Sequence, residues 1–421
     1  MAKKKGFLLI FAYMVIAVLS VLLAALVARS IAEWRVAERD KNSTAAFYAA
    51  EAGIDYGLDW LRSQGNPPGG TAPFNLPAGP AIETGAYSVT IDPDNANPTA
   101  YLKRYQIIST GQSGDTTRVA TYEVKEDTFA RFAYLSDTEH FLRFIPVWFI
   151  TGDQLSGPVH TNSHFHISGN PVFTDVVSSV DDAISYMHGG PPNDNPSFQK
   201  GIKFGAPEIE MPSKALDLRT AAVQDGLHLT GPTTIVLNAD GTMNVTNSHE
   251  NWVNQNMPLP ANGALFVTGA QGGDNLWISG TLNGQLTVGT NRDLVITNNI
   301  TYNTNPVTNP SSTDMLGLIA EKDVIISQNA PSNLTIQASI LALDDSFYVE
   351  NWAGLPPKGK LNIYGGLIQD ARGPIGLFNP ATSTIISGYS KNYVYDPRLR
   401  NIPPPFFPTT GDYVGLSWRE Q

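Results

Sequence analysis

The sequence predicts an α+β fold: a long N-terminal helix with a transmembrane segment, a small antiparallel sheet, and a large all-β region. Three observations lead to this prediction. Residues 7–28 carry no charge, and the polar stretch after them has neither Pro nor Gly before residue 53. Beyond about residue 129, short apolar strands recur every eight to twelve residues between Gly, Asn and Asp. With 37 Gly, 30 Pro and 15% charged residues, the composition is typical of a turn-rich β protein.

The length of 421 residues exceeds one average domain. We expect a leader and long helix over 1–64 with a transmembrane part at 7–28, a linker and small sheet over 65–128, and a β-solenoid-like domain over 129–421. The first 62 residues carry 8 basic and 6 acidic side chains, which leaves 19 basic and 32 acidic in the rest. An acidic body without a basic stripe argues against binding to a phosphate backbone, so no nucleic-acid partner is expected. Cysteine is absent, which excludes disulfides and thiolate chemistry.

The N-terminal segment has the length and flanks of a membrane anchor. Its 22 uncharged residues from Phe7 to Ala28 span roughly 33 Å as a helix. The triplet Lys3 to Lys5 places the N-terminus in the cytoplasm and the rest outside, because cytoplasmic flanks are enriched in positive charge. A secretory signal would be shorter and would end in a small-residue cleavage site. Since no breaker follows, we expect one helix of about 56 residues to Arg62.

Two faces of the polar half of this helix differ in side-chain size. Small residues recur every four positions at Ala45, Ala49, Gly53 and Gly57, which allows another backbone to approach closely. A second stripe is apolar and suited to lying on a sheet. Its members are Phe47, Ala50, Ile54, Leu58 and Leu61.

The junction Lys5, Gly6, Phe7, the continuous apolar span and the run from Ala46 to Gly53 carry a family resemblance. The core of that run is Ala49, Ala50, Glu51, Ala52 and Gly53. The chain resembles type IV pilin-like proteins, above all the PilX-type pilus accessory proteins. The resemblance implies cleavage between Gly6 and Phe7 by a prepilin peptidase, methylation of the Phe7 amine, and packing of the helix among other pilins in a filament. It also implies a single-pass protein of the cytoplasmic membrane that is later displayed on the surface.

One position departs from the pattern of the major pilins. They carry a glutamate four residues after the cleavage-site aromatic, where this chain has Phe11. A carboxylate in hydrocarbon is tolerated only when it is paired, so its absence favours a minor pilin-like subunit over a bulk one. The alternative is a surface adhesin or binding module held by an ordinary signal anchor, with a host or surface ligand as its partner.

The rest of the chain is read as strands. Residues 87–91, 104–110 and 116–127 alternate as in a small antiparallel meander, which the apolar stripe of the helix would cover. For the large β region we favour an irregular β-solenoid, with a β-sandwich as the runner-up. Examples of the strands expected there are the seven segments 265–269, 275–282, 285–289, 293–302, 323–327, 334–343 and 361–368.

Three of the seven histidines lie close together at His160, His164 and His166. In a straight strand they would share one face, but His160 would lie roughly 13 Å from His164 unless the chain bends at Asn162 and Ser163. We therefore interpret this segment as a polar turn between coils, with a zinc site as the alternative.

Enzyme activity is not expected, because the chain has none of the nucleophile, zinc-protease or phosphate-loop motifs. No cofactor is expected either, and the acidic groups match no calcium-loop spacing. Aromatic residues crowd the last 70 positions. They are read as a cap on the open end of the solenoid, with a surface that binds a partner as the alternative.

Overall fold

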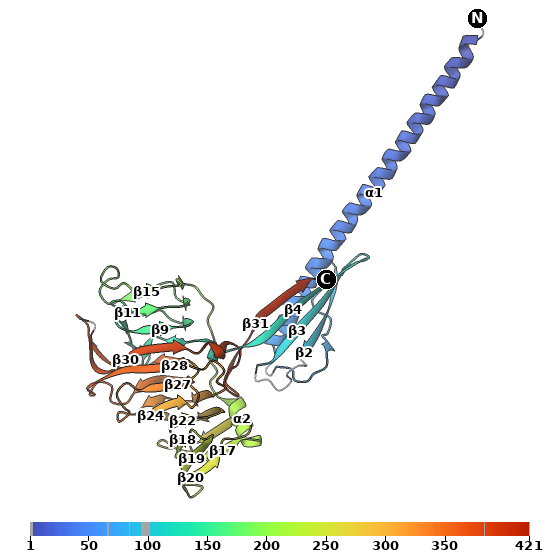
Figure 1. Ribbon diagram of the computed structural model, residues 1–421. Coiled ribbons are helices and arrows are strands. Elements are labelled where there is room, and N and C mark those ends of the chain that lie inside the picture. The colour runs from blue at the N-terminus through green and yellow to red at the C-terminus, as the bar shows by residue number, and fades with distance from the viewer. Residues whose placement is uncertain (1–2, 65–66, 84, 94–101, 383, 421) are drawn as a thin grey trace. The chain divides into compact units, whose positions relative to one another are not determined.

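The computed structural model describes residues 3–64, 67–83, 85–93, 102–382 and 384–420. The chain divides into two compact units, each treated by itself below. The helix–sheet unit comprises Met1–Glu126 and Tyr413–Gln421, and the second unit comprises Asp127–Asp412. The fold is α+β, as predicted: one long helix, a small sheet, and a large region built mostly of strands (Figure 1).

The first unit begins with helix α1 (Lys3–Arg62), 60 residues without interruption. The predicted single helix is confirmed. Every residue from Phe7 to Lys41 is exposed, whereas the buried positions of α1 begin at Ala46. By length and composition, α1 is the one described helix able to cross a membrane. Its apolar half thus has no cover within the described residues of this chain.

The sheet of the first unit is the predicted antiparallel meander with additions at both edges. Its strand order is β1-β2-β3-β4-β31. The bounds are β1 (Phe74–Asn75), β2 (Ala86–Pro93), β3 (Arg104–Ser113), β4 (Thr116–Thr128) and β31 (Thr409–Glu420). The three predicted strands are confirmed as β2, β3 and β4. The predicted division placed all of 129–421 in one region, whereas Tyr413–Gln421 belong to the first unit.

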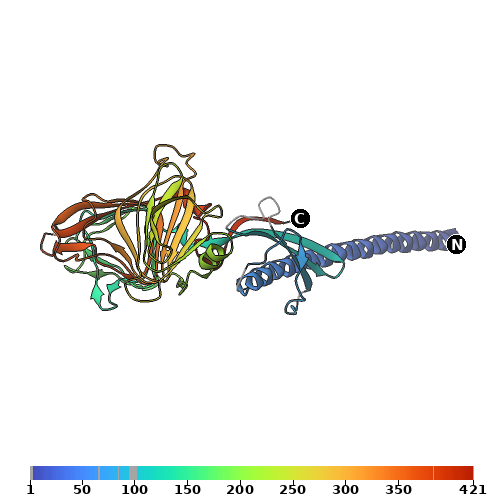
Figure 2. The same ribbon diagram turned by 90° about the horizontal axis from the view of Figure 1, so that it is seen from below.

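The C-terminal part of α1 lies across the face of this sheet (Figure 2). Small residues allow the close approach: Gly111 of β3 lies so near the helix that a Cβ built on it would come within 2.1 Å of the Ala46 carbonyl oxygen. Gly53 and Gly57 likewise face side chains of β2 and β3. The core of this unit combines helix and sheet residues, namely Ala50, Ile54, Leu61, Val89, Ile91, Tyr105, Ile107, Ala120, Val124 and Tyr413.

The second unit is a stack of coils whose strands pair in parallel with those of the next coil. The first coils contribute three faces. One face holds β5 (Tyr134–Thr138), β10 (Val159–Thr161), β13 (Val177–Ser179) and β16 (Ile202–Lys203). The second holds β8 (Phe149–Ile150), β11 (His166–Ser168) and β14 (Ser185–Tyr186). The third holds β9 (Gln154–Ser156), β12 (Val172–Phe173) and β15 (Ser197–Phe198).

The remaining coils follow a segment that contains α2 (Leu216–Gln224). Their strands are β17 (Leu227–Thr230), β18 (Thr233–Leu237), β21 (Ala264–Thr268), β22 (Leu276–Leu282), β23 (Gln285–Thr290), β24 (Leu294–Tyr302), β25 (Met315–Ala320), β26 (Val324–Ile326), β27 (Thr335–Val349), β28 (Pro357–Arg372) and β30 (Thr384–Tyr395). All seven strands expected in this region are present. Antiparallel additions are β19 (Thr242–Asn247), β20 (Trp252–Pro258) and β29 (Gly376–Asn379), besides the hairpin of β6 (His140–Phe141) and β7 (Ile145–Pro146). Two short 3-10 helices are η1 (Phe129–Arg131) and η2 (Pro397–Arg400).

The coils are not stacked in chain order. Strand β28 pairs in parallel with β5 through Leu367–Tyr134, and β30 pairs with β9 through Tyr393–Leu155. The last coil therefore lies against the first, in the middle of the stack, and β15 and β17 lie toward opposite ends (Figure 1). We call Asp127–Asp412 the coil stack, and the β28–β5 and β30–β9 junction the seam. A sandwich would pair its neighbouring strands mostly antiparallel, whereas these coils pair in parallel.

Candidate functional site

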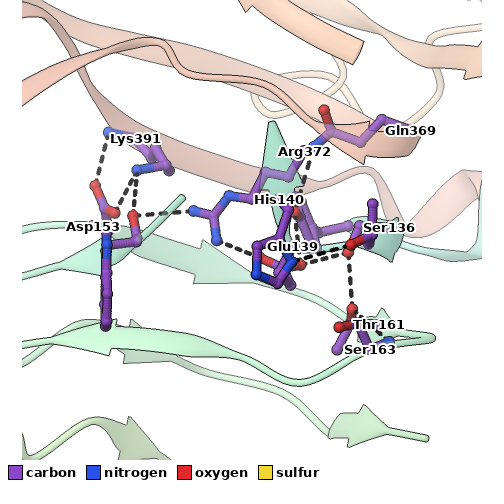
Figure 3. Close-up of polar contacts among 12 residues, drawn as sticks. Ser136, Glu139, His140, Asp153, Thr161, Ser163, Gln369, Arg372 and Lys391 are labelled. Atoms are coloured by element: carbon purple, nitrogen blue, oxygen red, sulfur yellow. Dashed lines mark hydrogen bonds and ion pairs between the residues drawn. The ribbon is translucent and has the colours of Figure 1, made fainter. Parts of the chain in front are cut away.

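The seam contains two buried ion pairs. Arg372 at the end of β28 donates from Nη1 to Glu139 Oε2 at 2.5 Å, and the two side chains are 2% and 0% exposed. Figure 3 shows the Arg372 guanidinium directed toward Glu139, which lies beside Ser136. Arg372 also donates to the Trp148 carbonyl at 3.2 Å and lies over the Phe149 ring, 3.5 Å from its centroid. The guanidinium is therefore held on several sides by the first coil.

The carboxylate of Glu139 is satisfied by the first coil. It accepts from the Tyr134 hydroxyl at 3.0 Å and from the Ser136 hydroxyl. Burial alone would lower the pKa of Arg372, but the nearby Tyr134 and Glu139 outweigh it and raise that pKa. The arginine stays charged, and its charge is neutralised within the seam.

The second pair joins β30 to the start of β9. Lys391 Nζ donates to Asp153 Oδ2 at 2.7 Å, and the Lys391 main-chain N–H donates to Oδ1 at 3.2 Å. Asp153 Oδ2 also accepts from the Ile150 N–H at 3.0 Å. Burial lowers the pKa of Lys391, and Asp153 offsets part of that effect. In both pairs, a cation of the last coil (Arg372 or Lys391) binds an anion of the first coil (Glu139 or Asp153). Charge complementarity therefore adds to strand pairing in holding these two coils together.

Sequence reasoning missed all four seam charges. The partners are 233 and 238 residues apart, and neither pair belongs to a recognisable motif. The residues around each of these charges are mostly polar or small, so the local sequence provided no signal that the charge would be buried. Charged side chains are seldom fully buried unless they are paired.

The three predicted histidines do not form one group. The chain bends at Asn162 and Ser163, and His160 turns away to contact Ser178 and Asn162 at 2.8 and 3.0 Å. His164 and His166 stay together, with ring centroids 4.8 Å apart. Of the three histidines grouped by the sequence, only His164 and His166 therefore lie together on one side of the coil.

The small residues predicted on α1 lie on its packed face. Ala49, Gly53 and Gly57 are buried and Ala45 is half-buried. In the family-like run, Ala50 is buried, whereas Glu51 and Ala52 are half-buried. Gly6 and Phe7, the predicted cleavage pair, both lie inside α1, and Phe7 is exposed. The role of these residues in processing or in packing between subunits stays a prediction.

The aromatic residues of β30 do not cap an open end, because this strand lies in the middle of the stack, and Tyr413 and Trp418 belong to the helix–sheet unit. Tyr389 and Tyr393 belong to the main core. Trp352, Phe378 and Tyr389 line an apolar cavity of about 260 Å³ beside the seam. The predicted cap is therefore wrong, since β28 and β30 are covered by β5 and β9.

The carboxyl groups of Asp293, Asp323 and Asp345 lie close together at one corner of successive coils. Asp293 Oδ1 accepts from the Asp323 N–H at 3.4 Å, and Asp323 Oδ1 accepts from the Ser346 N–H at 2.9 Å. Burial, together with the charges of Asp345 and Asp293, raises the pKa of Asp323 to about 7. This carboxyl group binds its proton near neutral pH.

The raised pKa predicts a pH-dependent stability. Between the unfolded pKa of about 3.9 and the folded pKa of about 7, the folded state holds a proton that the unfolded state releases. Stability is therefore expected to fall as the pH rises through this window. Asp323→Asn removes the titration and keeps an oxygen acceptor for the Ser346 N–H. The melting temperature of this variant should fall less between pH 5 and pH 8 than that of the parent.

The matched control for this measurement is Asp182→Asn, a change in an exposed bend of the same unit. It should leave the pH dependence of the melting temperature as in the parent. Equal pH dependence in the parent and Asp323→Asn would show that Asp323 does not contribute to it.

Comparison with known proteins gives limited matches. The model of a family described as a domain of unknown function (DUF4900) matches residues 100–181, which include Glu139 and Asp153 of the seam. The crystal structure of the competence-associated pilin ComZ from Thermus thermophilus is similar over 90% of this chain and 97% of that chain, at 12% identity and a TM-score of 0.37. No curated protein matches.

Proposed function

We propose that this chain is a minor pilin-like subunit whose N-terminal helix passes from the membrane into a type IV pilus or pseudopilus. One observation carries the proposal: α1 is continuous, its residues Phe7 to Lys41 are exposed, and its C-terminal part packs on its own sheet. The helix is therefore both an anchor and the spine of the folded unit.

The apolar half of α1 requires a cover outside the chain. Exposed apolar surface is unfavourable by roughly 25 cal/mol per Å², and the exposed fractions at Phe7, Leu9 and Tyr13 are 74%, 76% and 76%. Lipid or neighbouring helices supply that cover. Helix α1 has no break at the membrane surface. It can therefore leave the lipid and pack against neighbouring helices without refolding.

The charges along α1 favour a minor role. Phe11 brings no carboxylate into the apolar segment, so no ion pair with a neighbouring amine is available there. The polar segment from Glu33 to Lys41 is exposed and carries both signs, with Arg29 and Glu33 paired at 2.9 Å. Such a segment suits contacts with subunits above and below.

The coil stack, which we class as an irregular β-solenoid, is the displayed part in this proposal. Its role is packing and presentation on the cell surface, at or near the tip, and not catalysis. The proposed partners are the membrane before assembly, a prepilin peptidase, and other pilins through α1. The competing proposal, a tethered adhesin with a surface ligand, uses the same helix as a permanent anchor.

Mass spectrometry of the mature N-terminus separates the two proposals. We expect the chain recovered from filaments to begin at a methylated Phe7, having lost residues 1–6. Gly6→Val should block this processing and keep the chain in the membrane fraction. Gly69→Val serves as a control, because no atom lies within 4 Å of a Cβ at Gly69.

A tethered adhesin predicts a different pattern. The Met1 end would be intact in the parent, and both valine variants would stay in the membrane fraction in equal amounts. That result would overturn incorporation into a filament and would leave the surface-binding proposal.

A further inference from the structure

Three imidazole rings meet beside the seam, and they are not the three that the sequence pattern grouped. The ring centroid of His166 lies 4.7 Å from that of His140 and 4.8 Å from that of His164. The third separation, between His140 and His164, is 6.1 Å. His140 comes from β6 of the first coil, and the other two come from the second coil.

Hydrogen bonds engage one nitrogen on each of two rings. His164 Nδ1 contacts Asp181 Oδ2 at 2.9 Å, and His140 Nδ1 contacts Thr138 Oγ1 at 3.2 Å. In the described part of the chain, no hydrogen bond engages the Nε2 atom of either ring. A histidine whose Nδ1–H donates to a carboxylate presents the Nε2 lone pair, which is the arrangement common among metal ligands.

The third ring, His166, is 5% exposed, and neither of its nitrogens has a hydrogen-bond partner within the described residues. Buried polar groups in folded proteins nearly always have a partner, and a bound ion would supply one for one of these two nitrogens.

We propose that His140, His164 and His166 bind one divalent transition-metal ion of the zinc class, with water as the fourth ligand. Zinc–nitrogen bonds of about 2.0–2.1 Å place the centroids of three tetrahedral imidazole ligands about 5 Å apart. The three measured separations lie on either side of this value. Asp181 orients His164 by accepting its Nδ1–H.

The rings are not yet arranged as ligands. Among the described residues, no group of three His, Cys, Asp or Glu side chains could hold a metal ion in the positions that the structure gives them. The His166 ring packs edge-on at 85° to His140 and at 66° to His164. Rotation about χ2, which is a soft torsion in histidine, would turn the lone pairs toward a common point.

Bound metal would connect the β6–β7 hairpin to the second coil. His140 directly follows Glu139, whose charge balances that of Arg372, so the cation would enter a neighbourhood in which the nearest buried charges are already paired. The His164 side chain is 30% exposed, which leaves a route for the ion from solvent. The metal would therefore stabilise the coil stack next to the seam.

The test is titration of the full-length, tag-free chain in detergent with Zn²⁺ and, separately, with Co²⁺. We expect one ion per chain, an increase in melting temperature with Zn²⁺, and visible Co²⁺ absorption of a four-coordinate nitrogen site. His140→Ala and His164→Ala should each abolish the Co²⁺ signal, and Asp181→Asn should weaken binding roughly 10-fold.

Two histidine variants outside the cluster serve as controls. His249→Ala, at an exposed position, and His160→Gln should both retain one ion per chain. His140 and His164 are each only partly buried, so their variants are expected to fold, which circular dichroism checks. Absence of saturable Zn²⁺ binding, or binding that survives His140→Ala, would overturn the proposal. Loss of binding in His160→Gln together with retention in His140→Ala would move the site to the histidines grouped by sequence.

Discussion

Replacing Arg372 with alanine is expected to lower the free energy of unfolding of the coil stack by about 3–5 kcal/mol. The reason is the partner left behind: Glu139 is fully buried, and its Oε2 would lose the donor 2.5 Å away. An unpaired buried charge is far more costly than a buried pair, because water can no longer solvate it. The variant also loses the packing of the guanidinium on the Phe149 ring.

The measurement is denaturant unfolding of the full-length chain in detergent, followed by tryptophan fluorescence, since Trp148 and Trp352 both lie near the seam. Arg143→Ala is the matched control. Arg143 pairs with Asp370 at 2.5 Å but is 62% exposed, and its removal should change stability by about 1 kcal/mol or less. The double variant Glu139→Gln with Arg372→Met should recover part of the loss, because no unpaired charge remains. Equal effects of Arg372→Ala and Arg143→Ala would contradict a stabilising role of the buried pair.

Local patterns explain why the elements were predictable. The helix follows from an unbroken run of helix formers, and strands such as β22 and β24 follow from β-branched and apolar runs between turn residues. The order of the coils was not predictable in this way. Each coil presents the same kind of apolar strand, so the periodicity does not show that β28 pairs with β5.

The same limit applies to the candidate sites. His164 and His166 were singled out because they are two residues apart, but the third ring belongs to His140, which lies in another coil. Spacing along the chain instead favoured His160, which the bend at Asn162 turns away. The seam charges are subject to the same difficulty, because their pairing depends on the parallel register between coils that are distant in sequence.

Replacing Gly111 with alanine is expected to lower the stability of the helix–sheet unit by about 2–3 kcal/mol, near the upper end of overpacking effects. Gly111 is buried on β3, and a Cβ there would come within 2.1 Å of the Ala46 carbonyl oxygen and 2.4 Å of the Ala50 nitrogen. Both are backbone atoms of α1, so the clash can be relieved only by moving the helix away from the sheet. Melting of the full-length chain, followed by hydrogen exchange in β3, measures the effect.

A second glycine on the same interface makes this prediction specific. A Cβ at Gly53 would come within 2.1 Å of the Ser109 hydroxyl, which can rotate away, and alanine gains about 1 kcal/mol in helix propensity over glycine. Gly53→Ala should therefore destabilise less than Gly111→Ala, and Gly69→Ala, with open space around it, should have little effect. If Gly111→Ala melted at the parent's temperature, α1 would not lie against β3 as closely as the structure places it. The anchor helix and the folded unit would then not form one body, and the proposed passage of the helix into a filament would lose its physical basis.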